Sequence, residues 1–89
     1  MDTLLVEKES IPSLSFSNKS SVKQHPNLRK QIDKATILGN IHRRKVSIVF
    51  EDDHGTKRVD TTIWASGAKN VCLKGGVWIP INRLKEIKV

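Results

Sequence analysis

Histidine and cysteine are the residue types in this chain most able to bind a metal, but their spacing does not favour a metal site. Zinc sites in proteins are built from ligands that occur in close pairs along the sequence. His25, His42, His54 and Cys72 form no such pair. The sequence therefore predicts no metal, and nothing else in it calls for a cofactor.

Acidic and nucleophilic residues also give no catalytic pattern. Asp52 and Asp53 are adjacent carboxylates, but they precede Gly55 in a polar segment, where such acids usually form turns. Cys72 has no evident base beside it and is expected to be a structural thiol. We therefore predict that the protein is not an enzyme and has no catalytic residues.

Tryptophans and cations are better candidates for a binding surface. Aromatic rings stack on nucleic acid bases while neighbouring cations neutralise phosphates. Strand alternation directs both tryptophans away from the aliphatic core, and residues 43–45 form the densest cationic run. The candidate nucleic-acid contacts are Arg43, Arg44, Lys45, Arg58, Trp64, Lys74 and Trp78.

Both features also have a structural interpretation. Trp64 and Trp78, flanking Cys72, would form a surface on which a helix docks, and we favour this packing role over contact with a ligand. A ligand-facing role for at least one tryptophan remains the alternative. The run at 43–45 is also typical of a solvated strand entry.

Charge and composition limit the partners. The chain has 89 residues, a formal net charge of +7 and a sequence pI near 9.9, so we expect an anionic partner. No apolar run approaches the length of a membrane span, and the start of the sequence does not resemble a signal peptide. A single cysteine fits a reducing compartment. We therefore expect a cytoplasmic protein that does not enter a membrane.

The chain divides into a tail and one domain. Residues 1–24 are largely Ser-rich and without periodicity, which predicts a flexible, disordered tail. Residues 25–89 form the predicted domain.

Pro26 is suited to open a helix whose apolar stripe contains Leu28, Ile32 and Ala35. Gly39 and the following asparagine are a plausible stop.

Alternation with period two follows the helix. Val46, Ile48 and Phe50 mark one face of a first strand, and a loop at residues 51–56 leads to a second strand at residues 58–64. On this second strand the expected inner residues are Val59, Thr61 and Ile63. Arg58 and Trp64 fall on the opposite face.

The Gly75-Gly76 pair predicts a hairpin. A three-residue loop at 74–76 places Leu73 opposite Val77 and keeps the apolar residues of both strands on one face, so we prefer it to a two-residue loop. A helical turn at residues 82–86 and a short last strand at residues 87–89 follow. The predicted fold is mainly β: a small SH3-like or Sm-like antiparallel barrel with an N-terminal helix and the tail.

The run from Leu28 to Ile87, with VSIVFEDDHGTKRVDTTIW followed by KNVCLKGGVWIPINRLKEI, resembles the Rof family of small Rho-binding antitermination barrels. This resemblance implies a helix followed by a bent antiparallel sheet, and a protein partner. Rof proteins engage Rho through an acidic surface, whereas this chain is basic. The Sm-like and ribonuclease P barrel-subunit families have a similar layout and bind RNA, which fits the charge better.

Two functions therefore stand as hypotheses. The first is a non-catalytic binding module that contacts RNA or single-stranded nucleic acid through a basic surface. The second is a protein-interaction adaptor of the Rof type, in which a barrel edge or the tail captures a protein partner.

Overall fold

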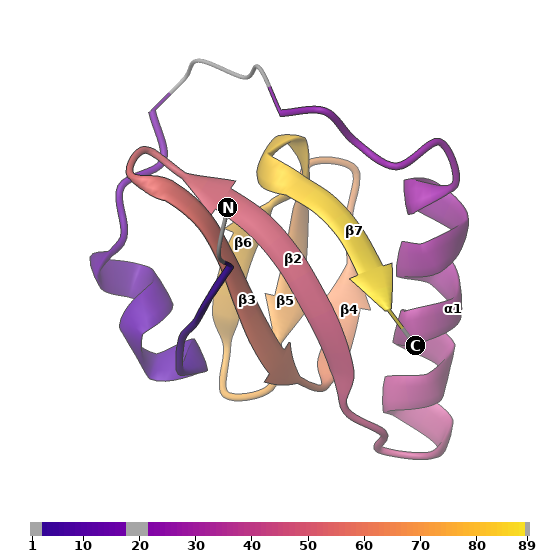
Figure 1. The fold of residues 1–89 in the computed structure, drawn as a ribbon. Helices are drawn as coiled ribbons and strands as arrows, with labels where there is room; N and C mark the ends of the chain where they lie inside the picture. Colours follow the sequence, from indigo (N-terminus) through magenta and orange to yellow (C-terminus); the bar gives the residue numbers. More distant parts are fainter. Residues whose placement is uncertain (1–2, 18–21, 89) are drawn as a thin grey trace.

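The change from helical to alternating periodicity near residue 45 separates one α-helix from a β-rich remainder. The structure is a computed structural model that describes residues 3–17 and 22–88. Its elements, in chain order, are β1 (Leu4–Leu5), the 3₁₀ helix η1 (Lys8–Ser13), α1 (Leu28–Ile41), β2 (Val46–Asp52), β3 (Gly55–Thr61), β4 (Ile63–Ser66), β5 (Asn70–Leu73), β6 (Val77–Pro80), the 3₁₀ helix η2 (Ile81–Arg83) and β7 (Leu84–Lys88). The fold is mainly β, as the sequence predicts (Figure 1).

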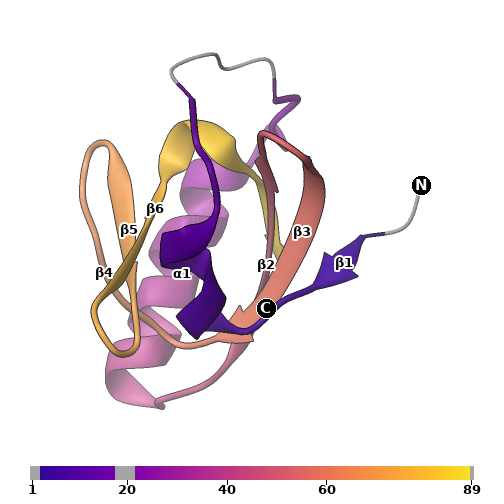
Figure 2. The same ribbon diagram turned by 90° about the vertical axis from the view of Figure 1, so that its left-hand side faces the viewer.

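The strands form two separate sheets. One has the order β1-β3-β2-β7 and the other the order β4-β5-β6. Neighbouring strands are antiparallel except for β1, which runs parallel to β3. Among the described residues no strand pairing joins one sheet to the other, so the predicted closed barrel is not found. Figure 2 shows the two sheets facing each other across the core.

Two helices cover the gaps between the sheets. α1 packs against β4 and β7, whereas η1 packs against β6 and β3. In Figure 2 these helices lie behind and in front of the space between the sheets. Apolar side chains from α1 and η1 thus seal the core at positions where a closed barrel would use strand pairing.

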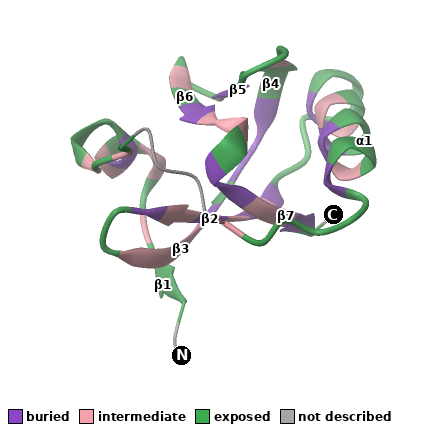
Figure 3. Ribbon diagram, turned by 90° about the horizontal axis from the view of Figure 1, so that it is seen from above, coloured by how far each residue is buried: buried purple, intermediate pink, exposed green. Residues whose placement is uncertain are grey.

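The buried stripe of α1 agrees with the sequence prediction. Leu28, Ile32 and Ala35 are buried and belong to the same core as the strands, and the buried side of the helix faces the sheets in Figure 3. The predicted ends are wrong, because the helix begins at Leu28 rather than Pro26 and continues through Gly39.

Gly39 continues the helix because it is a packing residue rather than a helix stop. A Cβ atom at this position would overlap the backbone carbonyl oxygen of Ile63 and would lie 3.0 Å from Cγ2 of Thr62. Only glycine lets α1 approach the start of β4 this closely.

The strand predictions hold in their central features. Val46, Ile48 and Phe50 are buried on β2. The hairpin between β5 and β6 has the predicted register, with Leu73 opposite Val77. In its turn Gly75 and Gly76 have φ values of 90° and 82°, a conformation in which a residue with a Cβ atom would be strained. The turn predicted at 82–86 is instead η2, and the last strand begins at residue 84.

Residues 3–17 differ from the predicted flexible tail. Ile11 on η1 is 1% exposed, and Phe16 lies 6.0 Å from Phe50, measured between ring centroids. The Val6 N–H donates to the Arg58 carbonyl at 2.8 Å. The apolar residues of this segment that reach the core, Val6, Ile11, Leu14 and Phe16, do so singly, so they leave no periodic signal. Residues 1–2 and 18–21 of the predicted tail lie outside the described residues.

We expect Gly39→Ala to lower the free energy of unfolding by at least about 2 kcal/mol. Alanine improves helix propensity by roughly 1 kcal/mol, but its Cβ would force backbone apart, and such overpacking outweighs that gain. Chemical denaturation measures the difference. Gly67→Ala is the control, because a Cβ at Gly67 would meet only the Asn70 carbonyl oxygen at 3.6 Å. Equal midpoints for wild type and Gly39→Ala would contradict the packing role.

Candidate nucleic-acid interface

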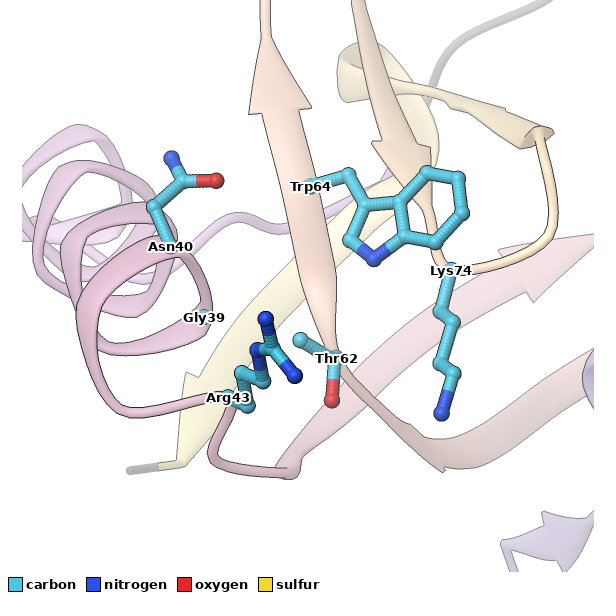
Figure 4. Close-up of a pocket in the computed structure, with 6 residues that line it drawn as sticks. All are labelled: Gly39, Asn40, Arg43, Thr62, Trp64 and Lys74. Carbon is cyan, nitrogen blue, oxygen red and sulfur yellow. The ribbon is translucent and has the colours of Figure 1, made fainter.

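A pocket of about 450 Å³ lies where the end of α1, the junction between β3 and β4, and the turn between β5 and β6 meet. Figure 4 shows the indole of Trp64 above the pocket, with the side chains of Arg43 and Lys74 on either side. The lining residues are Gly39, Asn40, Arg43, Thr62, Trp64 and Lys74.

Arg43 enters this pocket because the chain reverses directly after α1. Its φ of 50° is the only positive value at a non-glycine residue in the described part of the chain. The reversal brings the Arg44 N–H within 3.3 Å of the Leu38 carbonyl, which also accepts the His42 N–H. A left-handed residue other than glycine costs about 1 to 2 kcal/mol, so this backbone position is strained.

Thr62 is the bend between the two sheets. It separates β3 from β4, and its carbonyl oxygen accepts the backbone N–H of Lys74 at 2.9 Å. This bond holds Lys74, in the β5–β6 turn, beside the bend. The Thr62 residue is 6% exposed, and its hydroxyl, which forms no hydrogen bond within residues 3–17 and 22–88, is accessible from the pocket.

A β-bulge directs Trp64 outward. Ile63 pairs with Leu73 and Ala65 pairs with Cys72, which leaves Trp64 as the extra residue of β4. Cys72 also pairs with Trp78 on β6. The outer face of the β4-β5-β6 sheet therefore carries a tryptophan on each side of Cys72.

The structure differs from the favoured packing role of the tryptophans. Trp64 is 48% exposed and Trp78 is 56% exposed. The apolar stripe of α1 instead joins the core between the sheets, so the helix needs no tryptophan surface. The other alternative, contact with a ligand, remains open to both side chains.

Cations of this site are not neutralised by carboxylates. Arg43 and Lys74 form neither an ion pair nor a side-chain hydrogen bond with any described residue. Arg58, in contrast, pairs with Asp60 at 3.3 Å. The positive charge at the pocket is therefore available to an anionic ligand.

The structure brings together only some of the predicted contacts. Arg43, Trp64 and Lys74 line one pocket. Arg44 and Lys45 are exposed in the connection from α1 to β2, outside that lining. The predicted common face of Arg58 and Trp64 is wrong, because the bend at Thr62 places them in different sheets.

Sequence reasoning missed three residues of the pocket. The sequence pattern indicates a helix stop at Gly39 and Asn40 and assigns no role to Thr62. Their role depends on contacts between elements distant in sequence, and the one local signal was a glycine in an otherwise helical pattern.

Asp52 and Asp53 have structural partners. The Oδ1 atom of Asp52 accepts the His54 N–H at 2.8 Å and the Lys57 ammonium at 3.1 Å. Asp53 accepts the backbone N–H of Ser17 at 3.0 Å and the buried Arg83 guanidinium at 2.7 Å. These contacts join the β2–β3 turn to η2 and to the N-terminal segment.

These bonds set the pKa of both carboxyls. Burial acts to raise the pKa of Asp52, but the His54 N–H and the Lys57 ammonium together hold it below its ordinary value of 3.8. The Ser17 N–H is the largest cause of the lowered pKa of Asp53; burial opposes it, and Arg83 reinforces it.

Within the described ranges, no three side chains of His, Cys, Asp or Glu gather where they could hold a metal ion. The described helices are all too short or too polar to span a bilayer. Comparison of the chain with protein-family models, curated proteins and solved structures gives no match.

We expect acid to destabilise the fold through Asp52 and Asp53. Because folding lowers their pKa, their stabilisation is complete above the ordinary value of 3.8 and is lost as the pH falls below it. Asp53→Asn should therefore be less stable than wild type near neutral pH, and the difference should shrink toward about pH 2. Urea denaturation across this range measures both curves. If the difference in free energy of unfolding between wild type and Asp53→Asn stays constant with pH, the lowered pKa of Asp53 in the folded protein would be contradicted.

Proposed function

We propose that this protein is a non-catalytic binding module that contacts RNA or single-stranded DNA. The binding face consists of the outer side of the β4-β5-β6 sheet and the adjoining pocket. One observation carries the proposal: Arg43 and Lys74, both without ionic partners, flank the half-exposed ring of Trp64. Aromatic stacking combined with free cations is the chemistry that binds single strands without a fixed sequence.

The distribution of carboxylates supports this choice of face. Asp52, Asp53 and Asp60 each pair with a cation located elsewhere on the molecule. None of these acids lines the pocket. Arg43 and Lys74 therefore keep an uncompensated positive charge beside the exposed tryptophan, in a chain with a net charge of +7.

Neighbouring residues extend the proposed footprint. Arg44 and Lys45 follow directly on Arg43 and are exposed, so they can contact successive phosphates. Trp78 offers a second ring across the sheet, beside Cys72. Arg58 is outside the footprint in this proposal, because it is engaged with Asp60 on the other sheet.

The order of elements supports a fold assignment of the same kind. A helix, the strands β2, β3 and β4, the β5–β6 hairpin, a short 3₁₀ turn and a last strand follow the layout of SH3-like and Sm-like barrels when β3 and β4 are counted as one strand bent at Thr62. We propose that the two sheets are an open form of this architecture. The RNA-binding barrels with this layout suit a basic chain better than Rof proteins do.

A protein-interaction adaptor is the second candidate. Ile37 and Ile41 are one helical turn apart on α1 and are 57% and 69% exposed. Exposed apolar pairs of this kind occur where helices contact partner proteins. This face points away from the core and does not include the pocket.

Fluorescence anisotropy with a labelled oligouridylate and a labelled oligothymidylate of about ten nucleotides tests the first candidate. Affinity should fall steeply between about 50 mM and about 200 mM salt. Arg43→Gln and Lys74→Gln should each reduce the log-log salt slope by about 0.7, the value for one lost phosphate contact on a single strand. Arg58→Gln is the control of equal charge change, and it should bind like wild type.

Two further results decide the outcome. Arg43→Gly should raise the free energy of unfolding by about 1 kcal/mol while weakening binding, which separates the strain of the backbone from the role of the side chain. Absence of binding to either oligonucleotide at about 50 mM salt would overturn the proposal and leave the adaptor as the better account.

A further inference from the structure

The pocket beside Trp64 differs from the rest of the outer sheet face because it is concave and is lined by the Thr62 hydroxyl as well as by two cations. Resting on the proposed function, we infer that this pocket holds one unpaired nucleotide of a single strand. The base lies against the Trp64 indole, and the phosphate lies between Arg43 and Lys74. The remainder of the strand follows the open sheet face.

The size of the pocket suits a ligand of this class. Its volume of about 450 Å³ lies in the range of small-molecule sites, which is about 300 to 1,000 Å³. A base with its sugar and phosphate is a small molecule in this sense, whereas a base-paired duplex could not enter.

The hydroxyl of Thr62 points to a polar ligand. Thr62 is 6% exposed, lines the pocket, and forms no side-chain hydrogen bond in the described part of the chain. Figure 4 shows its oxygen directed toward the opening between Arg43 and Lys74. The hydroxyl oxygen itself is accessible at the pocket surface, so a polar group that enters the pocket can form a hydrogen bond with it.

The backbone at Arg43 adds a second indication. Glycine or asparagine would occupy its left-handed conformation with less strain, yet the position carries a long cationic side chain. Figure 4 shows the guanidinium reaching toward Thr62. Strained residues of this kind cluster at ligand sites, where their side chains must be held in one direction.

An uncharged ligand that stacks on the Trp64 indole would form no ion pair with Arg43 or Lys74. A simple anion without an aromatic group would not stack on the indole. The combination of an exposed indole, two free cations and an unpaired hydroxyl fits a group with a flat π-face and a phosphate. A nucleotide within a strand and a free nucleotide share this chemistry. The experiment distinguishes these two sources.

Intrinsic fluorescence can report on each ring separately, because the chain has two tryptophans and no tyrosine. Trp78→Phe leaves Trp64 as the only indole, and Trp64→Phe leaves Trp78. An oligouridylate of about ten nucleotides should quench Trp78→Phe in a saturable way. Uridine 5′-monophosphate should do so only at much higher concentration. An oligomer of abasic deoxyribose phosphates should bind through charge without quenching Trp64.

Thr62→Val is the sharpest variant, because it retains the shape of the side chain and removes only the hydroxyl. Binding to the oligouridylate should weaken by about two- to tenfold, the effect of one lost hydrogen bond. Its melting temperature should not fall, since the hydroxyl has no partner in the described structure. A variant that binds like wild type, or that loses affinity only because it unfolds, would overturn the inference.

The remaining outcomes separate the two proposals. If the oligouridylate binds by anisotropy but leaves the Trp64 emission unchanged, the face binds nucleic acid and the nucleotide pocket is wrong. If the abasic oligomer quenches Trp64 as strongly as the oligouridylate does, the inference that a base stacks on Trp64 would also be wrong. Stronger quenching by uridine 5′-monophosphate than by the oligouridylate would identify a free nucleotide as the ligand. It would contradict the inference that the pocket holds a nucleotide of a single strand. If no oligonucleotide binds at about 50 mM salt, both proposals fail together.

Discussion

The whole structure depends on how two short sheets are sealed without pairing their edges. Sheets of three and four strands face each other, and the gaps between them expose the core on two sides. Hydrogen bonds between strands could close such gaps only if the strands were longer or more strongly bent. Here α1 closes one gap and η1 the other, each by burying apolar side chains. Residues such as Ile11 are therefore as much a part of the core as those of the strands.

This sealing also places the candidate site. The end of α1 can reach the start of β4 only because Gly39 has no side chain. The contact delivers Asn40 and Arg43 to one side of Trp64. The bend at Thr62, required to pass from one sheet to the other, binds the backbone of Lys74 and holds it nearby. The pocket is thus a consequence of the two places where the sheets and the helix meet.

Charge pairing then distinguishes the faces of the molecule. Asp52 and Asp53 are used to fix the β2–β3 turn against Lys57 and Arg83, which stabilises the end of the fold remote from the pocket lining. The cations around Trp64 have no such partners. Unpaired cations also occur elsewhere among the described residues, for example at Lys30, Lys34 and Lys69, so the feature specific to this face is that two unpaired cations flank an exposed indole.

Local patterns were sufficient to predict the elements with regular periods. The stripe of α1, the buried face of β2 and the register of the β5–β6 hairpin follow from spacing and from glycine conformations. Residues 3–17 could not be predicted in this way, because Ile11 and Phe16 act as isolated apolar contacts. Such contacts are stabilised by distant partners and leave no repeat in the sequence.

The candidate site was predictable only in its residue types. Arg43, Trp64 and Lys74 were identified as cations and an aromatic ring, but their meeting in one pocket depends on Gly39 and Thr62. Arg58 was assigned to the same face by strand alternation, and alternation fails wherever a strand bends between sheets. Sequence periodicity carries no information on such a bend until the tertiary contacts are known.

We propose that the outer face of the β4-β5-β6 sheet, together with its pocket, binds single-stranded nucleic acid. Titration with an oligouridylate at about 50 mM salt, followed by amide chemical shifts, would locate the bound strand. We expect the largest changes at Arg43, Thr62, Trp64, Cys72, Lys74 and Trp78. Changes confined to β1, β2, β3 and β7, or no changes at all, would contradict it.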